Sequence, residues 1–200
     1  MTIKVPYIRI EKIRQIADEF REKYSKNKIP VDILYIAEMD LGMEIRPVKS
    51  LRNEADTDAF ISSDFKVIFV DNDELCDDKY ESRLRFSIAH ELAHFILHKD
   101  FFEKFKIGSL GGYLNFVEGF SDREYSFLEL HAHEFAGRLL VPVDILRCKV
   151  SEWKNEIKNT AALKFIDNSL FADYLAVPIA KDFGVSQEVI ARRIEKEKLL

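Results

Sequence analysis

The chain has little cysteine and no apolar stretch long enough for a membrane helix. Its two cysteines, Cys76 and Cys148, do not have the spacing of a metal-binding pair, and we predict two reduced thiols. A membrane span needs roughly 20 consecutive apolar residues, and no stretch approaches that length. The first residues, MTIKVPYIRIEKIRQ, also lack the basic start and apolar centre of a secretion signal. We therefore expect a cytoplasmic protein with no membrane partner.

An excess of basic charge is absent as well. The 200 residues include 35 acidic and 30 basic side chains, which give a formal net charge of −5 and a pI near 5.6. This balance disfavours a protein whose main task is to bind phosphate backbones, so we do not expect nucleic acid as the main partner. With 47% hydrophobic residues, the chain has enough apolar side chains for one ordinary folded core.

Apolar spacing predicts helices toward both ends of the chain and a few strands between them. Helical spacing of three and four residues occurs after Val31 and at residues 10–24, 78–98, 123–140, 171–180 and 186–199. β-Branched and aromatic residues mark expected strands at residues 43–48, 58–62 and 66–70. Residues 99–122 hold four of the seven glycines, and we expect a long loop there. This order predicts an α+β fold, mostly helical, with a small mixed or antiparallel sheet.

All five histidines fall in two short segments, at positions 90, 94, 98, 131 and 133. His90 and His94 belong to the run His-Glu-Leu-Ala-His in a predicted helix, where residues four apart lie about one turn apart on one face. Both imidazoles can therefore reach one ion. Zinc accepts imidazole nitrogens at roughly 2.0–2.1 Å and can keep one position open. The run predicts a zinc site with His90 and His94 as ligands.

Glu91 and His98 lie on the same predicted helix. Glu91 is rotated by about 100° from His90, so its carboxylate lies beside the metal rather than on it. From there it can accept a proton from water as a general base. His98 would lie about 12 Å from His90 along the helix axis, too far to share one ion with both other histidines. We expect it to act at the helix end, where an imidazolium is mildly stabilising.

A third ligand must come from another element, and the helix at 123–140 is the obvious donor. Projected at about 100° per residue, His131 and Glu129 flank its apolar stripe, whereas His133 and Glu134 point toward solvent. A neutral imidazole matches two other imidazoles on zinc better than a carboxylate does. We therefore predict His131 as the third ligand, with Glu129 or Glu134 as the alternative.

Two longer blocks surround these residues. Residues 85–98 read RFSIAHELAHFILH and residues 132–142 read AHEFAGRLLVP. They resemble two ordered blocks of the ImmA/IrrE family of metallo-endopeptidases, RFTLAHELGH with a further histidine and EANxFAAxLLMP. The glutamate that opens the second block is taken as the family's third zinc ligand, and the alignment places His131 there. The replacement of this glutamate by His131 removes one negative charge and should make the metal-bound water more acidic.

The resemblance implies a zincin-like metallopeptidase domain, which we expect over residues 1–145. A helical, helix-turn-helix-like region is expected to pack on it over 146–200, with one single domain as the alternative. The resemblance also implies zinc-dependent cleavage or inactivation of a helix-turn-helix repressor, so the expected partner is a protein substrate. An extended peptide could pair with the strand at 66–70 beside the catalytic helix. Tyr113 and Tyr125 lie near the site in sequence, but neither is identifiable as an oxyanion stabiliser.

Two other functions remain open from the sequence. The protein could be a non-proteolytic regulator whose zinc is closed by a fourth protein ligand, Glu129 or His133, as in structural zinc sites. It could also bind DNA through its C-terminal helices, because residues 182–194 have the rhythm of a helix-turn-helix. The mixed charges at 192–198, however, are typical of a solvated helix. Binding to duplex DNA is the weaker of these two hypotheses.

Overall fold

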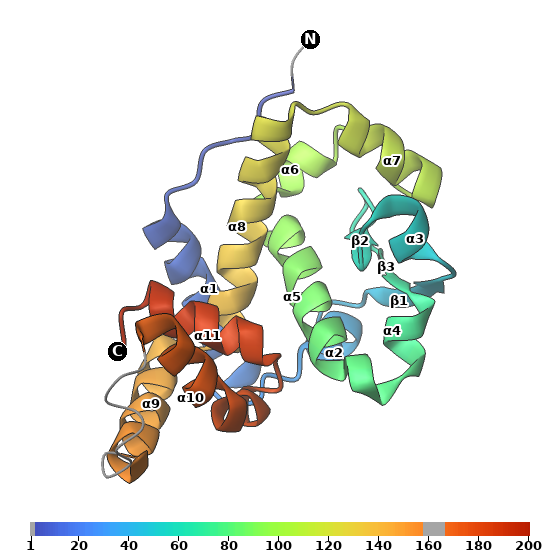
Figure 1. The fold of residues 1–200 in the computed structure, drawn as a ribbon. Helices are drawn as coiled ribbons and strands as arrows, with labels where there is room; N and C mark the ends of the chain where they lie inside the picture. The colour runs from blue at the N-terminus through green and yellow to red at the C-terminus, as the bar shows by residue number, and fades with distance from the viewer. Residues whose placement is uncertain (1–2, 158–166) are drawn as a thin grey trace.

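The structure, a computed structural model, describes residues 3–157 and 167–200, and it confirms the α+β fold (Figure 1). The helices are α1 (Ile10–Ser25), α2 (Ile33–Tyr35), α3 (Leu51–Ala55), α4 (Asn72–Cys76), α5 (Glu81–Leu97), α6 (Lys99–Phe102), α7 (Leu110–Glu118), α8 (Asp122–Leu140), α9 (Val143–Ile157), α10 (Asn168–Phe183) and α11 (Gln187–Lys196). A π-helical turn, η1 (Ile36–Asp40), continues α2, and a 3-10 turn, η2 (Asp78–Tyr80), precedes α5. The strands are β1 (Glu44–Val48), β2 (Ala59–Ile61) and β3 (Val67–Asp71).

The three strands form one small mixed sheet in the order β1-β3-β2. β1 runs parallel to β3, and β2 runs antiparallel to it. The predicted strand segments are therefore confirmed, but β3 is the central strand. Because β1 and β2 occupy both of its edges, β3 cannot pair with a substrate peptide, and that expectation was wrong. β2 is the edge strand on the side of α5.

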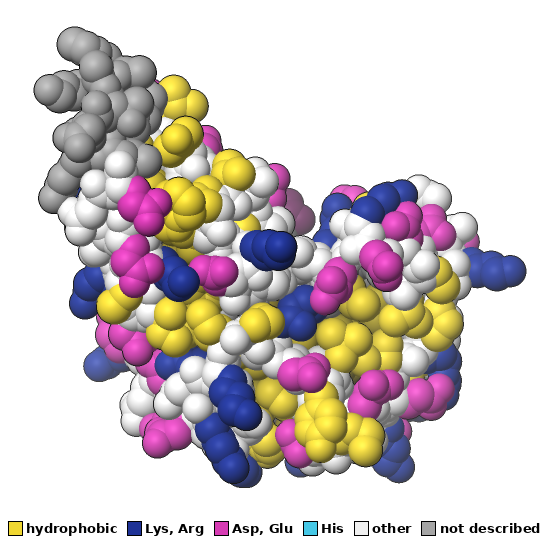
Figure 2. All heavy atoms as spheres, turned by 90° about the horizontal axis from the view of Figure 1, so that it is seen from below, with side chains coloured by type: hydrophobic (Ala, Val, Ile, Leu, Met, Phe, Trp, Pro, Cys, Tyr) yellow, Lys and Arg dark blue, Asp and Glu magenta, His cyan; other side chains and the backbone are white. Residues whose placement is uncertain are grey.

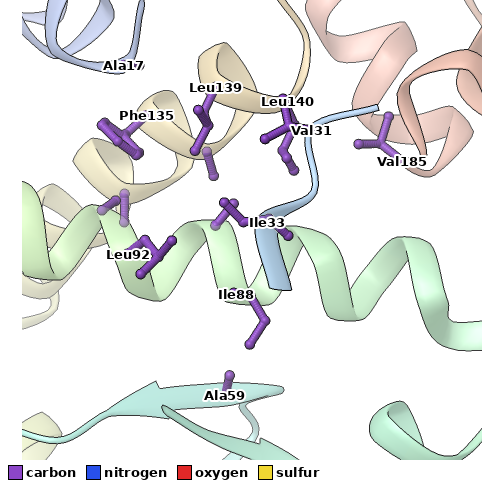
Figure 3. Packing of buried hydrophobic residues seen from close by; sticks show 14 of the residues in the cluster. Ala17, Val31, Ile33, Ala59, Ile88, Leu92, Phe135, Leu139, Leu140 and Val185 are labelled. Atoms are coloured by element: carbon purple, nitrogen blue, oxygen red, sulfur yellow. The ribbon is translucent and has the colours of Figure 1, made fainter. Parts of the chain in front are cut away.

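Helix α5 is the centre of the fold, because it packs against β2 on one side and α8 on the other. Figure 3 shows Ile88 of α5 pointing toward Ala59 of β2, with Phe135 and Leu139 on the neighbouring α8. Ile88 and Leu92 are fully buried. A helix enclosed on both sides needs apolar residues around most of its circumference. The few polar side chains that α5 keeps buried therefore require partners.

Residues 99–122, which we expected to form a long loop, contain the helices α6 and α7. Phenylalanines hold this segment together through ring contacts among Phe101, Phe102, Phe105, Phe116 and Phe120. Their burial overrides the low helix propensity of the glycines, which is a weak effect of about 1 kcal/mol for each one. The loop prediction weighed glycine content and overlooked the spacing of the aromatic residues.

The C-terminal helices are joined to α5 through Arg85. Its guanidinium donates a 2.9 Å hydrogen bond from Nε to the carbonyl oxygen of Gly184, and a second from Nη2 to that of Val31. Gly184 ends α10 with a φ of +63°, and a Cβ there would lie 2.8 Å from Arg85 Nε. Glycine is therefore required both by the backbone conformation and by the close approach of Arg85.

Glu134 is buried at the meeting point of three helices, although the helical projection had placed it toward solvent. Its carboxylate accepts a 2.6 Å hydrogen bond from Arg14 of α1 and one from Lys196 of α11. Arg193 of α11, which is 4% exposed, lies 3.6 Å from the same carboxylate. The solvated helix expected at 192–198 is therefore wrong for Arg193, because α11 turns this residue inward onto α8.

Cys76 and Cys148 are separate free thiols, both exposed. Within the described residues, no helix is long and apolar enough to cross a membrane. The predicted boundary between residues 145 and 146 falls inside α9, and the division into two domains stays a prediction. On the face drawn in Figure 2, acidic and basic side chains are interspersed, and no histidine is visible.

The buried Glu134 generates a stability prediction. Burial raises the pKa of its carboxyl, but the hydrogen bonds from Lys196 and Arg14 outweigh burial and hold the pKa below its ordinary value of 4.5. Glu134→Gln should lower the free energy of unfolding at pH 7 by about 2 kcal/mol, because the buried Arg193 and the more exposed Arg14 and Lys196 lose a charged partner. Since the native pKa is depressed, the wild type loses this advantage as the pH falls below 4.5 through the native pKa.

Urea unfolding of both proteins between pH 7 and pH 3 measures the difference. Glu195→Gln, which makes the same change at an exposed position of α11, is the control and should stay within about 0.5 kcal/mol of the wild type. A Glu134→Gln protein as stable as this control at pH 7 would contradict the role of the ion pairs.

Candidate metal centre

Two imidazole nitrogens and the two oxygens of one carboxylate converge where α5 packs against α8. His90 Nε2 lies 3.2 Å from His94 Nε2 and 3.0 Å from Glu129 Oε2. His94 Nε2 lies 3.7 Å from Glu129 Oε1. Residues four apart on α5 supply the two imidazoles, as the sequence predicted, and α8 supplies the carboxylate.

These separations can be compared with those around a tetrahedral ion. Zinc ligands lie at roughly 2.0–2.2 Å, so two donors on one tetrahedral ion are about 3.3 Å apart. The three separations at the site, from 3.0 to 3.7 Å, bracket that value. Two imidazole nitrogens and one carboxylate oxygen also form a donor set typical of catalytic zinc. The donor types and separations are therefore suited to a divalent transition metal, with His90 and His94 each nearest to a different oxygen of Glu129.

The protonation of His94 and Glu129 suits ligation, whereas the raised pKa of His90 favours its protonated form. Burial lowers the pKa of His94 well below its ordinary value, so this imidazole is neutral. Burial would raise the pKa of Glu129, but the neighbouring His90 holds it below the ordinary value. Burial would also lower the pKa of His90, and the Glu129 carboxylate raises it instead. A neutral imidazole and an ionised carboxylate are the forms that bind metal.

Glu91 lies beside the donors, as predicted. A carboxylate oxygen of Glu91 lies within 4.8 Å of the ligand nitrogens of both His90 and His94. The side chain is buried, which raises its pKa to about 7, and it accepts a backbone hydrogen bond from Ile61 of β2. A proton acceptor therefore lies beside the converging donors.

His131 is not brought together with His90 and His94. Its Nδ1 lies 3.1 Å from Nε2 of His98, one turn further along α5, and the residue is 2% exposed. The physical reason is that residues two apart on α8 project about 200° apart. The packing of α8 on α5 turns Glu129 toward the donors and His131 toward His98. Glu134 is also excluded, because its carboxylate is engaged by Arg14 and Lys196.

His98 lies at the end of α5, as expected, but it does not carry the positive charge that we expected there. Burial, and then the neighbouring His131, lower its pKa to about 3. Its side chain is 2% exposed, so a charged imidazolium would have little access to water. The interior position of the helix end outweighs the modest attraction of the helix dipole.

A cleft leads from solvent to the donors. Beside His90, Glu91 and Glu129, its walls are formed by Arg52, Asp58, Arg83, Phe86, Tyr125 and His133. A smaller pocket adjoins the cleft and shares His90, Glu91 and Glu129 with it, and Tyr113 and Phe116 of α7 line its far end. The Tyr113 and Tyr125 hydroxyls lie 3.1 Å apart, and Tyr125 hydrogen-bonds Glu129. Both tyrosines thus adjoin the site, which sequence proximity alone could not establish.

His133 lies at the rim of this cleft. Its ring centroid is 4.8 Å from that of His90, in an edge-on contact. One of its nitrogens, the Glu129 carboxylate and a His90 nitrogen lie within 4.8 Å of one another. The residue is exposed, as we expected. It nevertheless adjoins the donors, which the projection of α8 had not indicated.

Comparison with known proteins agrees with this geometry. Residues 40–195 match the model of the peptidase M78 family, described as an IrrE N-terminal-like domain. The chain belongs to the peptidase M78 family. The resemblance to ImmA/IrrE metallopeptidases is thereby confirmed, and the M78 match includes both helices that carry the donors.

One relative of this M78 protein is an uncharacterized protein of Rickettsia bellii (strain RML369-C). It is 30% identical over 91 residues, which cover 41% of this chain and 31% of the relative. The chain thus matches less than a third of that protein's length. Family membership supports a metallopeptidase-like function.

The placement of Glu129 predicts which variant loses metal. After zinc loading and desalting, we expect stoichiometric zinc in the wild type and in His131→Ala, and loss of zinc from Glu129→Ala, which lacks one of three donors. Elemental analysis of the three proteins, with circular dichroism to verify folding, measures this. Full zinc in Glu129→Ala together with loss of zinc from His131→Ala would restore His131 as the ligand.

Proposed function

We propose that this protein is a zinc-dependent endopeptidase. The proposal rests on one observation. His90, His94 and Glu129 converge beside a buried Glu91, at the base of an open cleft. Three protein ligands leave one coordination position open, which distinguishes catalytic from structural zinc. The donor set, the neighbouring carboxylate and the access from solvent together suit hydrolysis.

His90, His94 and Glu129 would hold the ion. Zinc, when bound, supplies a Lewis acid that polarises a peptide carbonyl and acidifies water. Glu91 accepts the proton of the attacking water as general base and delivers it to the departing amine nitrogen. Its burial beside His90 and His94 keeps the carboxylate close to the reacting atoms. Walls formed by Phe86 and Tyr125 limit the water around them.

The substrate would enter as an extended chain. Residues 57–59, which lead into the edge strand β2, line the cleft next to Glu91. An extended peptide that passes there can form main-chain hydrogen bonds as an added strand. This replaces the central strand β3 with the edge strand β2 as the proposed peptide-binding element.

We further propose that the target is a helix-turn-helix transcriptional repressor or a similar regulator in the cytoplasm. The support for this is the resemblance of the two sequence blocks to ImmA/IrrE peptidases. Nucleic acid is not proposed as a partner, because the chain is acidic and α11 directs Arg193 into the protein.

A second function, zinc-dependent regulation without proteolysis, is favoured by one observation. His133 lies close enough to His90 and Glu129 for their donor atoms to group within 4.8 Å. If His133 became a fourth ligand, it would close the site and leave no position for substrate. The exposure of His133 and the open cleft favour the peptidase.

Glu91→Gln separates the two functions. We expect this variant to bind zinc normally and to lose cleavage by about 10²–10⁴-fold, because the amide cannot accept the proton. Cells that express the wild type or Glu91→Gln are compared by mass spectrometry of newly formed protein N-termini. Glu81→Gln, an exposed change at the start of the same helix, is the matched control and should cleave like the wild type.

New N-termini that depend on Glu91 and lie within repressor proteins would support both the activity and the target class. The same N-termini in the Glu91→Gln cells would show that the protein does not produce them, and would favour the regulator.

A further inference from the structure

From the proposed ligand His94, a series of three imidazoles leads into the interior, and no step of the proposed hydrolysis uses its last two members, His98 and His131. His94 Nδ1 lies 3.1 Å from His98 Nδ1, and His98 Nε2 lies 3.1 Å from His131 Nδ1. The three residues are 4%, 2% and 2% exposed, respectively. Each ring therefore depends on its neighbour for a hydrogen bond that water cannot readily supply.

The chemistry of imidazole gives this series one direction when metal is bound. A neutral imidazole carries one proton, so it donates from one nitrogen and accepts at the other. If His94 binds metal through Nε2, its proton is on Nδ1 and is donated to Nδ1 of His98. The proton of His98 must then be on Nε2, from which it is donated to Nδ1 of His131. One ligand thus determines the tautomers of two further residues.

We infer that His98 and His131 are positioning residues, which hold His94 in the tautomer and the ring orientation required for metal binding. The inference rests on the proposed zinc site. Metal-bound histidines generally donate their second ring N–H to a fixed acceptor, and the loss of that acceptor weakens metal binding. His98 is the acceptor here, and His131 in turn fixes the tautomer of His98.

The contacts around His94 favour this role over simple packing. Phe102 stacks on the face of the His94 ring with centroids 4.9 Å apart, so the ring cannot tilt freely, and its Nδ1 edge is left to His98. The helix end itself needs only the backbone of residue 98, whose N–H donates to the carbonyl of His94. Packing and capping therefore do not require an imidazole at position 98. The hydrogen bonds to His94 and to His131 do require one.

Zinc affinity, measured by competition with a coloured chelator, tests the inference on three variants. His98→Phe keeps a ring but removes the acceptor, and it should weaken zinc binding by about 10–100-fold. His98→Asn places an amide oxygen near the position of Nδ1 and should stay within a few-fold of the wild type. Phe101→Leu disturbs the same buried junction without touching His94, and its affinity should not change.

Wild-type affinity in His98→Phe would overturn the inference, as would equal losses in all three variants. Absence of zinc from the wild type would overturn the proposed metal site itself, which distinguishes the two failures. A second measurement needs no variant: in zinc-loaded, ¹⁵N-labelled wild type, the ring proton should be on Nδ1 of His94 and on Nε2 of His98. A proton on Nδ1 of His98 would reverse the series and overturn the inference.

Discussion

Helix α5 must bury polar side chains in the same turns that pack against the sheet and against α8. His94 and Glu91 are almost completely buried, yet their neighbours Ile88 and Leu92 belong to the apolar core. An unpaired buried polar group costs several kcal/mol, and an unpaired buried charge costs more. The packing of α8 satisfies these groups, because it brings Glu129 to His90 and His94 and brings His131 to His98. A metal ion would satisfy the remaining lone pairs.

The rest of the fold holds these two helices in place. The edge strand β2 packs against α5 on the side of Glu91. On the far face of α8, Glu134 joins α1 and α11 through Arg14 and Lys196, and Arg85 links α5 to the end of α10. The positions of the donors thus depend on contacts that lie outside the cleft. A site of this kind needs support beyond its ligands to hold them within a few tenths of an ångström.

The sequence predicts those parts of this arrangement that depend on local periodicity. The apolar repeats of α1, α5 and α8 locate these helices to within a few residues, and the four-residue spacing of His90 and His94 places two donors on one face. Local periodicity did not identify the third donor. Glu129 and His131 flank the apolar stripe of α8 at similar angles, so only the direction in which α8 packs on α5 selects between them.

Two other predictions, an exposed Glu134 and a loop at residues 99–122, also failed because contacts with distant parts of the chain decide the structure there. Glu134 is polar and lies off the apolar stripe, which is typical of an exposed residue, but α1 and α11 supply cations that allow it to be buried. Residues 99–122 are rich in glycine, but the contacts of Phe116 with Phe102 and Phe105 stabilise α7. In both cases the deciding partners lie on other helices. Spacing within one segment could not reveal them.

X-ray absorption at the zinc edge, on zinc-loaded wild-type protein, tests the central claim most directly, because it reports the atoms bound to the metal. We expect two imidazoles at roughly 2.0–2.1 Å, one carboxylate oxygen at about 2.0–2.2 Å and one further light atom from solvent. A spectrum with three or four imidazoles would contradict this expectation, because His131 or His133 would then be a ligand and the position for substrate would be altered or closed.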